Sequence, residues 1–305
     1  MYTTQNVRKE NKWFGEFVDA TVSRLGRNHP FVKSQFFCEE VDAQAGMFPP
    51  ERQMLMVGSQ ATRTAPEPGT TYAFLIDVAG QDEGQGQGMG GGPFDCAKNA
   101  PHRGEVQERG RDSTALKIVE IDRSTLALPG KPSYLVVHRQ EWCGEKHVQV
   151  FGALRALVLT WKPMRIVIDA TGVGEGLWSM LDNYLGSDKV VPVKFTAKLK
   201  SELGFGFIGM IESRRYREYD PFPEGLRLQM DRCRSEIVPG PTRLMRWGVP
   251  DGTRDPASGQ PVHDDDLITG ALCVMLDGLE WYFHSPSVWI NPKNPLKEMD
   301  RTSKG

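Results

Sequence analysis

Three consecutive aspartates, Asp264, Asp265 and Asp266, stand directly before a long apolar run in the segment VHDDDLITGALCVMLDGLEWYF. One aspartate is a favoured N-cap, and negative charge in a first helical turn is stabilising by roughly 0.3–1 kcal/mol per group. A cap needs only one such residue, and three adjacent like charges repel one another. The surplus indicates a positive partner near this point, such as a metal ion.

Two more aspartates occur in apolar segments far upstream. Asp77 lies in FLIDVAG and Asp169 ends the run RIVID. An ionised carboxylate among apolar residues costs several kcal/mol of desolvation unless it has a partner. Asp77 therefore needs a partner, which a metal ion would provide, and Asp169 could share that ion if the fold brings the two aspartates together.

The apolar runs predict the elements that hold these residues. Three strands separated by turn-prone segments favour an antiparallel meander, and the pattern then becomes βαβαβ, which requires right-handed parallel crossovers. If the fourth strand pairs with the first, the order is that of an α/β, ribonuclease H-like fold with a mixed five-stranded sheet flanked by helices. The expected strands are 71–80, 114–122, 133–142, 165–169 and 189–195; the expected helices are 13–25, 147–161, one after ATGVGEG, 198–217 and the Asp-led helix, and a hairpin is expected within 226–248.

This topology predicts a shared site for the carboxylates. Neighbouring strands lie about 4.8 Å apart, so Asp77 and Asp169 at matching height can share a cation. We expect the closing helix to add Asp265 and Asp266, with Asp264 as a cap or a further ligand, since successive helical residues point in different directions. Carboxylate oxygens without imidazole or thiolate suit Mg²⁺ or Mn²⁺, and two such ions catalyse phosphodiester hydrolysis.

The chain divides by composition into three regions. Residues 1–68 are expected to form an N-terminal helix and a linker arm rich in Pro, Gly and Thr. The ribonuclease H-like domain is expected over 69–285, with a Gly-rich, mobile insert at 81–111. Residues 286–305 are expected to be a C-terminal tail.

Charge is unevenly placed along a chain whose formal net charge is only −2. The segment 194–246 holds eleven basic residues against seven acidic ones, and such a patch suits phosphate contacts, although salt-bridged surface charge is the simpler explanation for any single residue. The candidate DNA backbone contacts are Lys194, Lys198, Lys200, Arg214 and Arg215.

Several classes of protein are disfavoured by what the 305 residues lack. No apolar run approaches the roughly 18 residues of a membrane helix, and the first residues lack the apolar core of a signal peptide, so a cytoplasmic protein is expected. The five cysteines form no CxxC pair, which argues against a disulfide framework or a zinc knuckle. No GxxxxGK[ST] phosphate loop occurs, so we do not expect ATP hydrolysis.

Several segments, in this order along the chain, resemble the nuclease domain of the large terminase subunit of tailed bacteriophages. They are FLIDVAG, RDSTALKIVEID, IVIDATGVGEGLW, KSELGFGFIGMIESRRYREY, and MRWGVPDGT with VHDDDLITGALC. The resemblance spans about residues 70–285. It implies a metal-dependent endonuclease that cuts double-stranded DNA during genome packaging in the host cytoplasm. By the same resemblance Asp77, Asp169 and the pair Asp265/Asp266 take the metal-ligand positions, with the third motif uncertain by one residue.

The resemblance also implies partners. Members of this family normally carry an ATP-driven translocase ahead of the nuclease, and residues 1–60 resemble the end of that ATPase domain and its linker. The expected partners are therefore the terminase small subunit, the portal, and an ATPase domain supplied by a longer terminase chain or by a separate protein.

Two rival functions fit parts of the sequence. The turn after Asp169, with Gly172, Gly174 and Gly176, resembles the nucleotide or S-adenosylmethionine loop of a doubly wound transferase. The next strand, however, ends in Lys194 and Lys198, where an acidic ribose ligand is expected. The second rival is a non-catalytic module that grips DNA or docks to the portal, with structural aspartates.

Overall fold

A computed structural model gives the arrangement of most of the chain. The predicted Gly-rich insert 81–111 and the predicted tail 286–305 lie outside the described residues. The structure describes residues 11–25, 27, 32, 36–37, 46–79, 113–127, 131–238 and 243–279.

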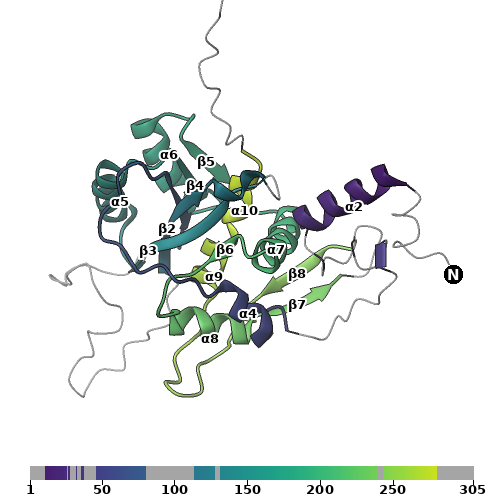
Figure 1. The fold of residues 1–305 in the computed structure, drawn as a ribbon. Helices are drawn as coiled ribbons and strands as arrows, with labels where there is room; N and C mark the ends of the chain where they lie inside the picture. The colour runs from purple at the N-terminus through teal and green to yellow at the C-terminus, as the bar shows by residue number, and fades with distance from the viewer. Residues whose placement is uncertain are drawn as a thin grey trace, which may run out of the picture.

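A mixed sheet of six strands forms the centre of the molecule, in the order β5-β4-β1-β2-β3-β6 (Figure 1). Neighbours β1/β2 and β2/β3 are antiparallel, whereas β1/β4, β4/β5 and β3/β6 are parallel. The predicted α/β, ribonuclease H-like topology is confirmed, with one strand more than the five predicted. The strands are β1 Tyr72–Asp77, β2 Ser113–Asp122, β3 Ser133–Cys143, β4 Arg165–Asp169, β5 Val190–Val193 and β6 Tyr216–Arg217.

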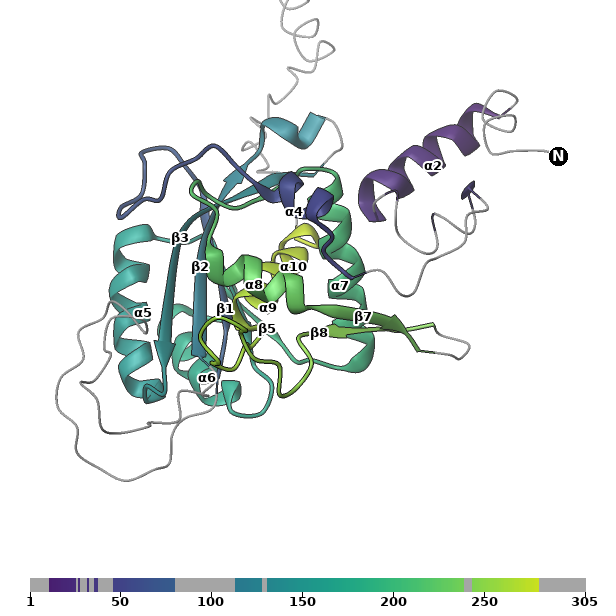
Figure 2. The same ribbon diagram turned by 90° about the horizontal axis from the view of Figure 1, so that it is seen from below.

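Helices cover both faces of this sheet (Figure 2). On one face lie α5 (His147–Trp161) and α6 (Gly174–Leu185). On the other lie α7 (Ala197–Glu212) and the short consecutive helices α9 (Asp265–Ala271) and α10 (Cys273–Asp277). The remaining helices are α2 (Lys12–Leu25), α4 (Pro50–Met56), α8 (Glu224–Arg232) and the 3₁₀ turn η2 (Ser124–Ala127).

Two predicted boundaries were wrong in the region after β5. Helix α7 ends at Glu212 rather than at 217, because Arg214 takes a left-handed φ of 57° and the chain then enters β6. Residues 224–232 form α8, where the hairpin was expected to begin. The hairpin itself is shorter and comprises β7 (Arg234–Ile237) and β8 (Met245–Gly248).

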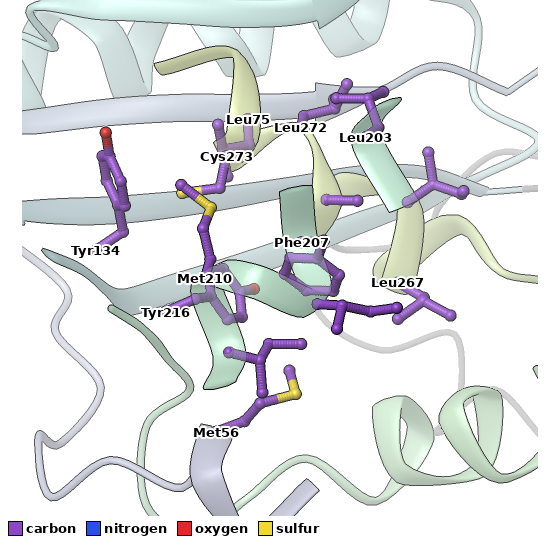
Figure 3. Packing of buried hydrophobic residues seen from close by; sticks show 14 of the residues in the cluster. Met56, Leu75, Tyr134, Leu203, Phe207, Met210, Tyr216, Leu267, Leu272 and Cys273 are labelled. Atoms are coloured by element: carbon purple, nitrogen blue, oxygen red, sulfur yellow. The ribbon is translucent and has the colours of Figure 1, made fainter. Parts of the chain in front are cut away.

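The apolar residues of the strands alternate between two cores. Phe74 and Ile76 of β1 face the core under α5 and α6, whereas Leu75 faces the core under α7, α9 and α10. Figure 3 shows this second core, in which Leu267 and Leu272 pack near Leu75 and Phe207. The period of two along each strand thus decides which side chains point toward α9.

Part of the predicted linker arm packs into this second core. Met47, Phe48 and Met56 are buried there, and Val57 forms an isolated parallel bridge with Glu218. Within the region predicted to be a linker arm, α4 is therefore part of the packing. The predicted division of the chain at residue 68 stays a prediction.

The cysteines differ in state. Cys233 and Cys273 are buried free thiols, while Cys143 at the end of β3 is disulfide-bonded. The sequence argued against a framework of several disulfides and did not single out this cysteine. Among the described helices, none has both the length and the apolar character needed to cross a bilayer.

Both edge strands of the sheet are poor templates for further pairing. β5 contains Pro192, which lacks a backbone donor, and β6 has only two residues. The sheet therefore ends on each side in a strand that offers few regular hydrogen bonds.

Two glycines in helices provide a matched test of the packing between α7 and the strand β8. A Cβ at Gly204 of α7 would lie 2.4 Å from Trp247 Nε1 of the hairpin, whereas a Cβ at Gly152 of α5 would meet no atom within 4 Å. We expect Gly204→Ala to lower the free energy of unfolding by about 1–3 kcal/mol through overpacking. Gly152→Ala should raise it by about 0.5–1 kcal/mol. Urea denaturation measures both, and equal effects would contradict the packing between α7 and β8.

Candidate active site

Asp77 and Asp169 occupy equivalent places at one edge of the sheet. β1 and β4 are parallel and pair Leu75 with Val167 and Ile76 with Ile168. Asp77 and Asp169 each follow by one residue, so both lie at the carboxyl ends of adjacent strands. Because side chains alternate, they share the face of Leu75 and Val167, which is the face covered by α9. The sequence prediction that this topology brings them together agrees with the register.

Burial and like charge act together on Asp77. Burial raises the pKa of Asp77 well above its ordinary value, and the negative charges of Asp265, Asp169 and Asp264 raise it further, against a smaller opposing effect of Lys200. Burial also raises the pKa of Asp169, although Thr171 N donates to its Oδ1 at 2.7 Å and opposes the shift. The edge is thus a place where several carboxylates meet with too little positive charge.

Glycines shape the turn that follows Asp169. Gly172 has a φ of +54°, and a Cβ on Gly174 would lie 2.3 Å from the carbonyl oxygen of Asp169. A side chain at position 174 would therefore push the start of α6 away from the strand end. This packing gives the GVGEG turn a structural reason that requires no nucleotide.

The three consecutive aspartates point to three different partners. Asp264 stands at the N-cap of α9, but its Oδ2 accepts from Val249 N at 3.3 Å rather than from the helix. Asp265 Oδ2 accepts from both Ser113 N and Ser113 Oγ, at 2.8 and 2.9 Å. Asp265 is thereby tied to the first residue of β2, at the same sheet edge as Asp77.

Asp266 points elsewhere. It is 1% exposed, its Oδ1 lies 3.2 Å from Lys117 Nζ, and its Oδ2 lies 3.2 Å from a terminal nitrogen of Arg139. The sequence placed Asp265 and Asp266 together as metal ligands, whereas the structure separates them because successive helical residues diverge by about 100°. Asp265 faces the acidic edge, and Asp266 faces a buried ion network.

The sequence reasoning missed this network. Glu218 is 0% exposed and accepts from Lys117 Nζ and from Tyr216 Oη. Burial lowers the pKa of Lys117, but Asp266 and Glu218 more than reverse that effect and the net pKa is raised. The sequence did hold a signal for this network. Lys117 alternates with Ala115 and Val119 along β2, so it lies on the buried face of the strand, where a charged residue needs a partner.

The five predicted basic residues are divided between opposite ends of the central sheet. Lys194 follows β5, whose last residue pairs with Asp169, and Lys198 and Lys200 lie in the first turns of α7. Arg214 and Arg215 instead precede β6, which pairs with Tyr134 at the far end of β3. The prediction therefore combined residues from both ends of the sheet.

Their surroundings differ as well. Lys194 and Lys198 are exposed and lie near Glu175 and Glu202. Arg215 is 2% exposed and donates to both oxygens of Asp277, which argues against a contact with DNA.

Of the five predicted basic residues, Lys200 is the one whose charge acts on Asp77. Its Nζ lies 3.7 Å from the position a Cβ on Gly248 would take, and Asp264 Oδ2 lies 2.6 Å from the same position. The ammonium also lies 5.7 Å from the centre of the Trp247 ring, whose Nε1 donates to the Lys200 carbonyl at 2.6 Å. The start of α7, the end of β8 and the start of α9 therefore converge at this point.

The donor set fits a hard divalent cation in its chemistry. Asp77, Asp169 and Asp265 supply only carboxylate oxygens. Burial and the neighbouring carboxylates raise the pKa of Asp77, and a bound cation would oppose that shift. Among the residues that the structure describes, however, no three His, Cys, Asp or Glu side chains already stand in a metal-holding arrangement. Binding would require their carboxylates to rotate toward a common point.

Comparison with known proteins supports the fold. No family model and no curated protein sequence matches the chain. The large terminase nuclease from thermophilic phage G20c with bound cobalt is 13% identical, with a TM-score of 0.51, over 77% of this chain and 98% of that one. The same nuclease with bound magnesium gives a TM-score of 0.50 at 13% identity and the same coverage.

A longer protein is similar to more of the chain. The large terminase from another thermophilic bacteriophage, in complex with ATP-γ-S, is 9% identical with a TM-score of 0.50, over 90% of this chain and 54% of that one. At these identities the likeness establishes the fold alone. The chain thus has the ribonuclease H-like fold of large terminase nuclease domains.

Because Asp77 is buried among other carboxylates, its negative charge should destabilise the metal-free protein. We expect Asp77→Asn to raise the Tm of the metal-free protein in EDTA at pH 7.5 by at least about 2 °C, the shift that about 1 kcal/mol produces in a domain of this size. The pKa of Asp77 is raised on folding, so its ionisation penalty is absent below the unfolded value of about 4 and grows as the pH rises.

The pH dependence supplies the check. Differential scanning calorimetry from pH 4 to 8 should show the advantage of Asp77→Asn widening with pH. A variant that is less stable than the wild type throughout this range would contradict the crowded site.

Proposed function

We propose that this chain is a divalent-metal-dependent endonuclease that cuts double-stranded DNA during viral genome packaging, as the nuclease part of a large terminase. The observation that carries the proposal is the convergence of Asp77, Asp169 and Asp265 at one edge of a ribonuclease H-like sheet, with Lys200 beside them. The similar G20c structures with bound magnesium and cobalt support the choice of a metal-dependent reaction.

We propose that the metal ligands are Asp77, Asp169 and Asp265. The metal is proposed to be Mg²⁺ or Mn²⁺, with two ions bound. When bound, these ions would supply Lewis-acid catalysis for phosphodiester hydrolysis. Asp264 stays a possible further ligand because its carboxylate adds to the negative charge felt by Asp77. Asp266 is left out, since its two oxygens lie 3.2 Å from the side-chain cations of Lys117 and Arg139.

The chain's own groups prepare the site in three ways. The strand ends fix Asp77 and Asp169 at the same height, and Ser113 orients Asp265 through two hydrogen bonds. Lys200 places a positive charge beside the carboxylates, where it can contact a phosphate oxygen of the DNA. Lys194 and Lys198 lie at the same edge and are proposed to contact the backbone further along.

The rival transferase is less well supported. A doubly wound nucleotide-binding fold has a mostly parallel sheet, whereas β1, β2 and β3 here are antiparallel. The glycines of the turn after Asp169 have a packing role instead.

The proposed partners follow from the same function. We propose that the chain acts with a terminase small subunit and the portal in the host cytoplasm. The match to about half of the longer large terminase, which was solved with ATP-γ-S, supports cooperation with an ATPase domain in a longer chain or a separate protein.

Plasmid nicking tests the assignment of the carboxylates. Purified protein should convert supercoiled plasmid to open-circular and linear forms with Mn²⁺ or Mg²⁺ and not with EDTA. Asp77→Asn and Asp169→Asn should each lower the rate by at least about 100-fold, the scale of losing one preorganised electrostatic group. Cleavage that continues unchanged in Asp77→Asn would refute the site, and a wild type that binds DNA without cutting would favour the non-catalytic module.

Lys200 provides a second test with a matched control. We expect Lys200→Met to slow nicking roughly 10-fold, as the loss of one charge-assisted contact of about 1.5 kcal/mol would. Lys189→Met removes an exposed lysine at the opposite end of β5 and should leave the rate within about twofold. Equal rates for the two variants, measured at the same salt concentration, would remove Lys200 from the proposed mechanism.

A further inference from the structure

Four charged residues, three of them buried and one partly exposed, lie between α9 and the sheet, and we call them the Asp266 cluster: Lys117, Arg139, Glu218 and Asp266. The side chains of Lys117, Glu218 and Asp266 are 1%, 0% and 2% exposed, and that of Arg139 is 23% exposed. Each ion buried in this way costs several kcal/mol unless it is well paired. Apolar residues of similar size would fill the same volume at lower cost, so stability alone does not account for the cluster.

The cluster is balanced in charge and joined without a break. Lys117 Nζ lies within 3.2 Å of Asp266 Oδ1 and also donates to Glu218, while Arg139 reaches the other oxygen of Asp266 at 3.2 Å. Arg139 also pairs with Glu141, which is partly exposed. Asp266 is therefore held from two strands, because β2 and β3 place Lys117 directly opposite Arg139.

The same strand holds the neighbouring aspartate. Ser113, Ala115 and Lys117 are alternate residues of β2 and so face the same side, about 6.6 Å apart from one to the next. Ser113 binds Asp265 and Lys117 binds Asp266, while Ala115 pairs with Asp77 of β1. The first turn of α9 is thus attached to β2 at two points that flank the strand position of Asp77.

The two attachments of α9 to β2 together fix its rotation, which a single attachment would leave free. Consecutive helical residues differ in direction by about 100°, so holding Asp265 and Asp266 to separate points on one strand fixes the rotation of α9 about its axis. A third contact, from Leu267 N to Gln229 Oε1 of α8 at 2.9 Å, secures the same turn. Without the Asp266 attachment, one of the two side-chain ties between this turn and β2 would be lost, at a place where the carboxylates repel one another.

We propose that Lys117 and Arg139 are positioning residues for the active site: by binding Asp266 they set the rotation of α9 that directs Asp265 toward Asp77. This inference rests on the proposed nuclease function and assigns the aspartate pair two different tasks. Asp265 belongs to the metal site, and Asp266 is the buried counter-ion that keeps Asp265 in place.

A double variant tests this without leaving an unpaired buried charge. Lys117→Met with Glu218→Gln removes one cation and one anion, and it leaves Asp266 paired with Arg139. The matched control is Arg52→Met with Glu212→Gln, which removes another largely buried pair, joined at 2.8 Å between α4 and the end of α7. Circular dichroism and Tm would show whether both variants fold.

Mn²⁺ binding and nicking then give the decisive readouts. In the Lys117/Glu218 variant we expect a 10–100-fold weaker Mn²⁺ affinity by calorimetry, the usual effect of losing a group that orients a ligand. Its nicking rate should return to within about threefold of the wild type at saturating Mn²⁺. The Arg52/Glu212 control should bind Mn²⁺ as the wild type does, and Asp265→Asn should lose cleavage at every Mn²⁺ concentration.

Other outcomes separate the possible failures. A wild type that neither binds Mn²⁺ nor cuts DNA refutes the proposed function. An unchanged Mn²⁺ affinity in the Lys117/Glu218 variant of an active enzyme refutes the positioning role alone, and a higher affinity would indicate that Asp266 is itself a ligand that Lys117 restrains.

Amide hydrogen exchange tests the positioning role whether or not the wild type cuts. Exchange over Asp265–Ala271 in the metal-free protein should be at least tenfold faster in the Lys117/Glu218 variant than in the wild type. Equal exchange in the two proteins would refute the role of Lys117.

Discussion

The constraint on which the rest of this structure depends is the docking of α9 against the sheet while its first turn carries like charges toward Asp77. Leu267, Ile268 and Leu272 are buried against the strands, and each such side chain contributes roughly 1.5–3 kcal/mol. This apolar contact offsets the repulsion at the acidic edge and the desolvation of Asp77. The unfavourable free energy of the acidic site is therefore offset by apolar packing further along the same short helix.

Much of the framework was predictable because it follows from local patterns. The runs around Asp77 and Asp169 read clearly as strands, and a meander followed by βαβαβ leaves few topologies that place the fourth strand beside the first. The height of the two aspartates then follows from parallel pairing. Elements of two residues, such as β6, give no periodic signal, and α8 was missed because its polar sequence resembles a hairpin as much as a helix.

The division of roles among the three consecutive aspartates was beyond the sequence. It depends on the rotation of α9, and an error of one residue turns a side chain by about 100°. That rotation is set by Ser113 and Lys117, which lie on β2, far from α9 along the chain. The basic residues show the same limit: Lys200 and Arg215 belong to one charged stretch, yet α7 carries them to opposite ends of the sheet.

The two edge strands of the sheet, β5 and β6, have a consequence for the protein at high concentration. Exposed strands with regular donors and acceptors recruit other strands and lead to fibrous aggregates. A proline in β5 and the brevity of β6 deny incoming chains such a template. We therefore expect the central sheet not to extend from one molecule into the next even when the protein is concentrated.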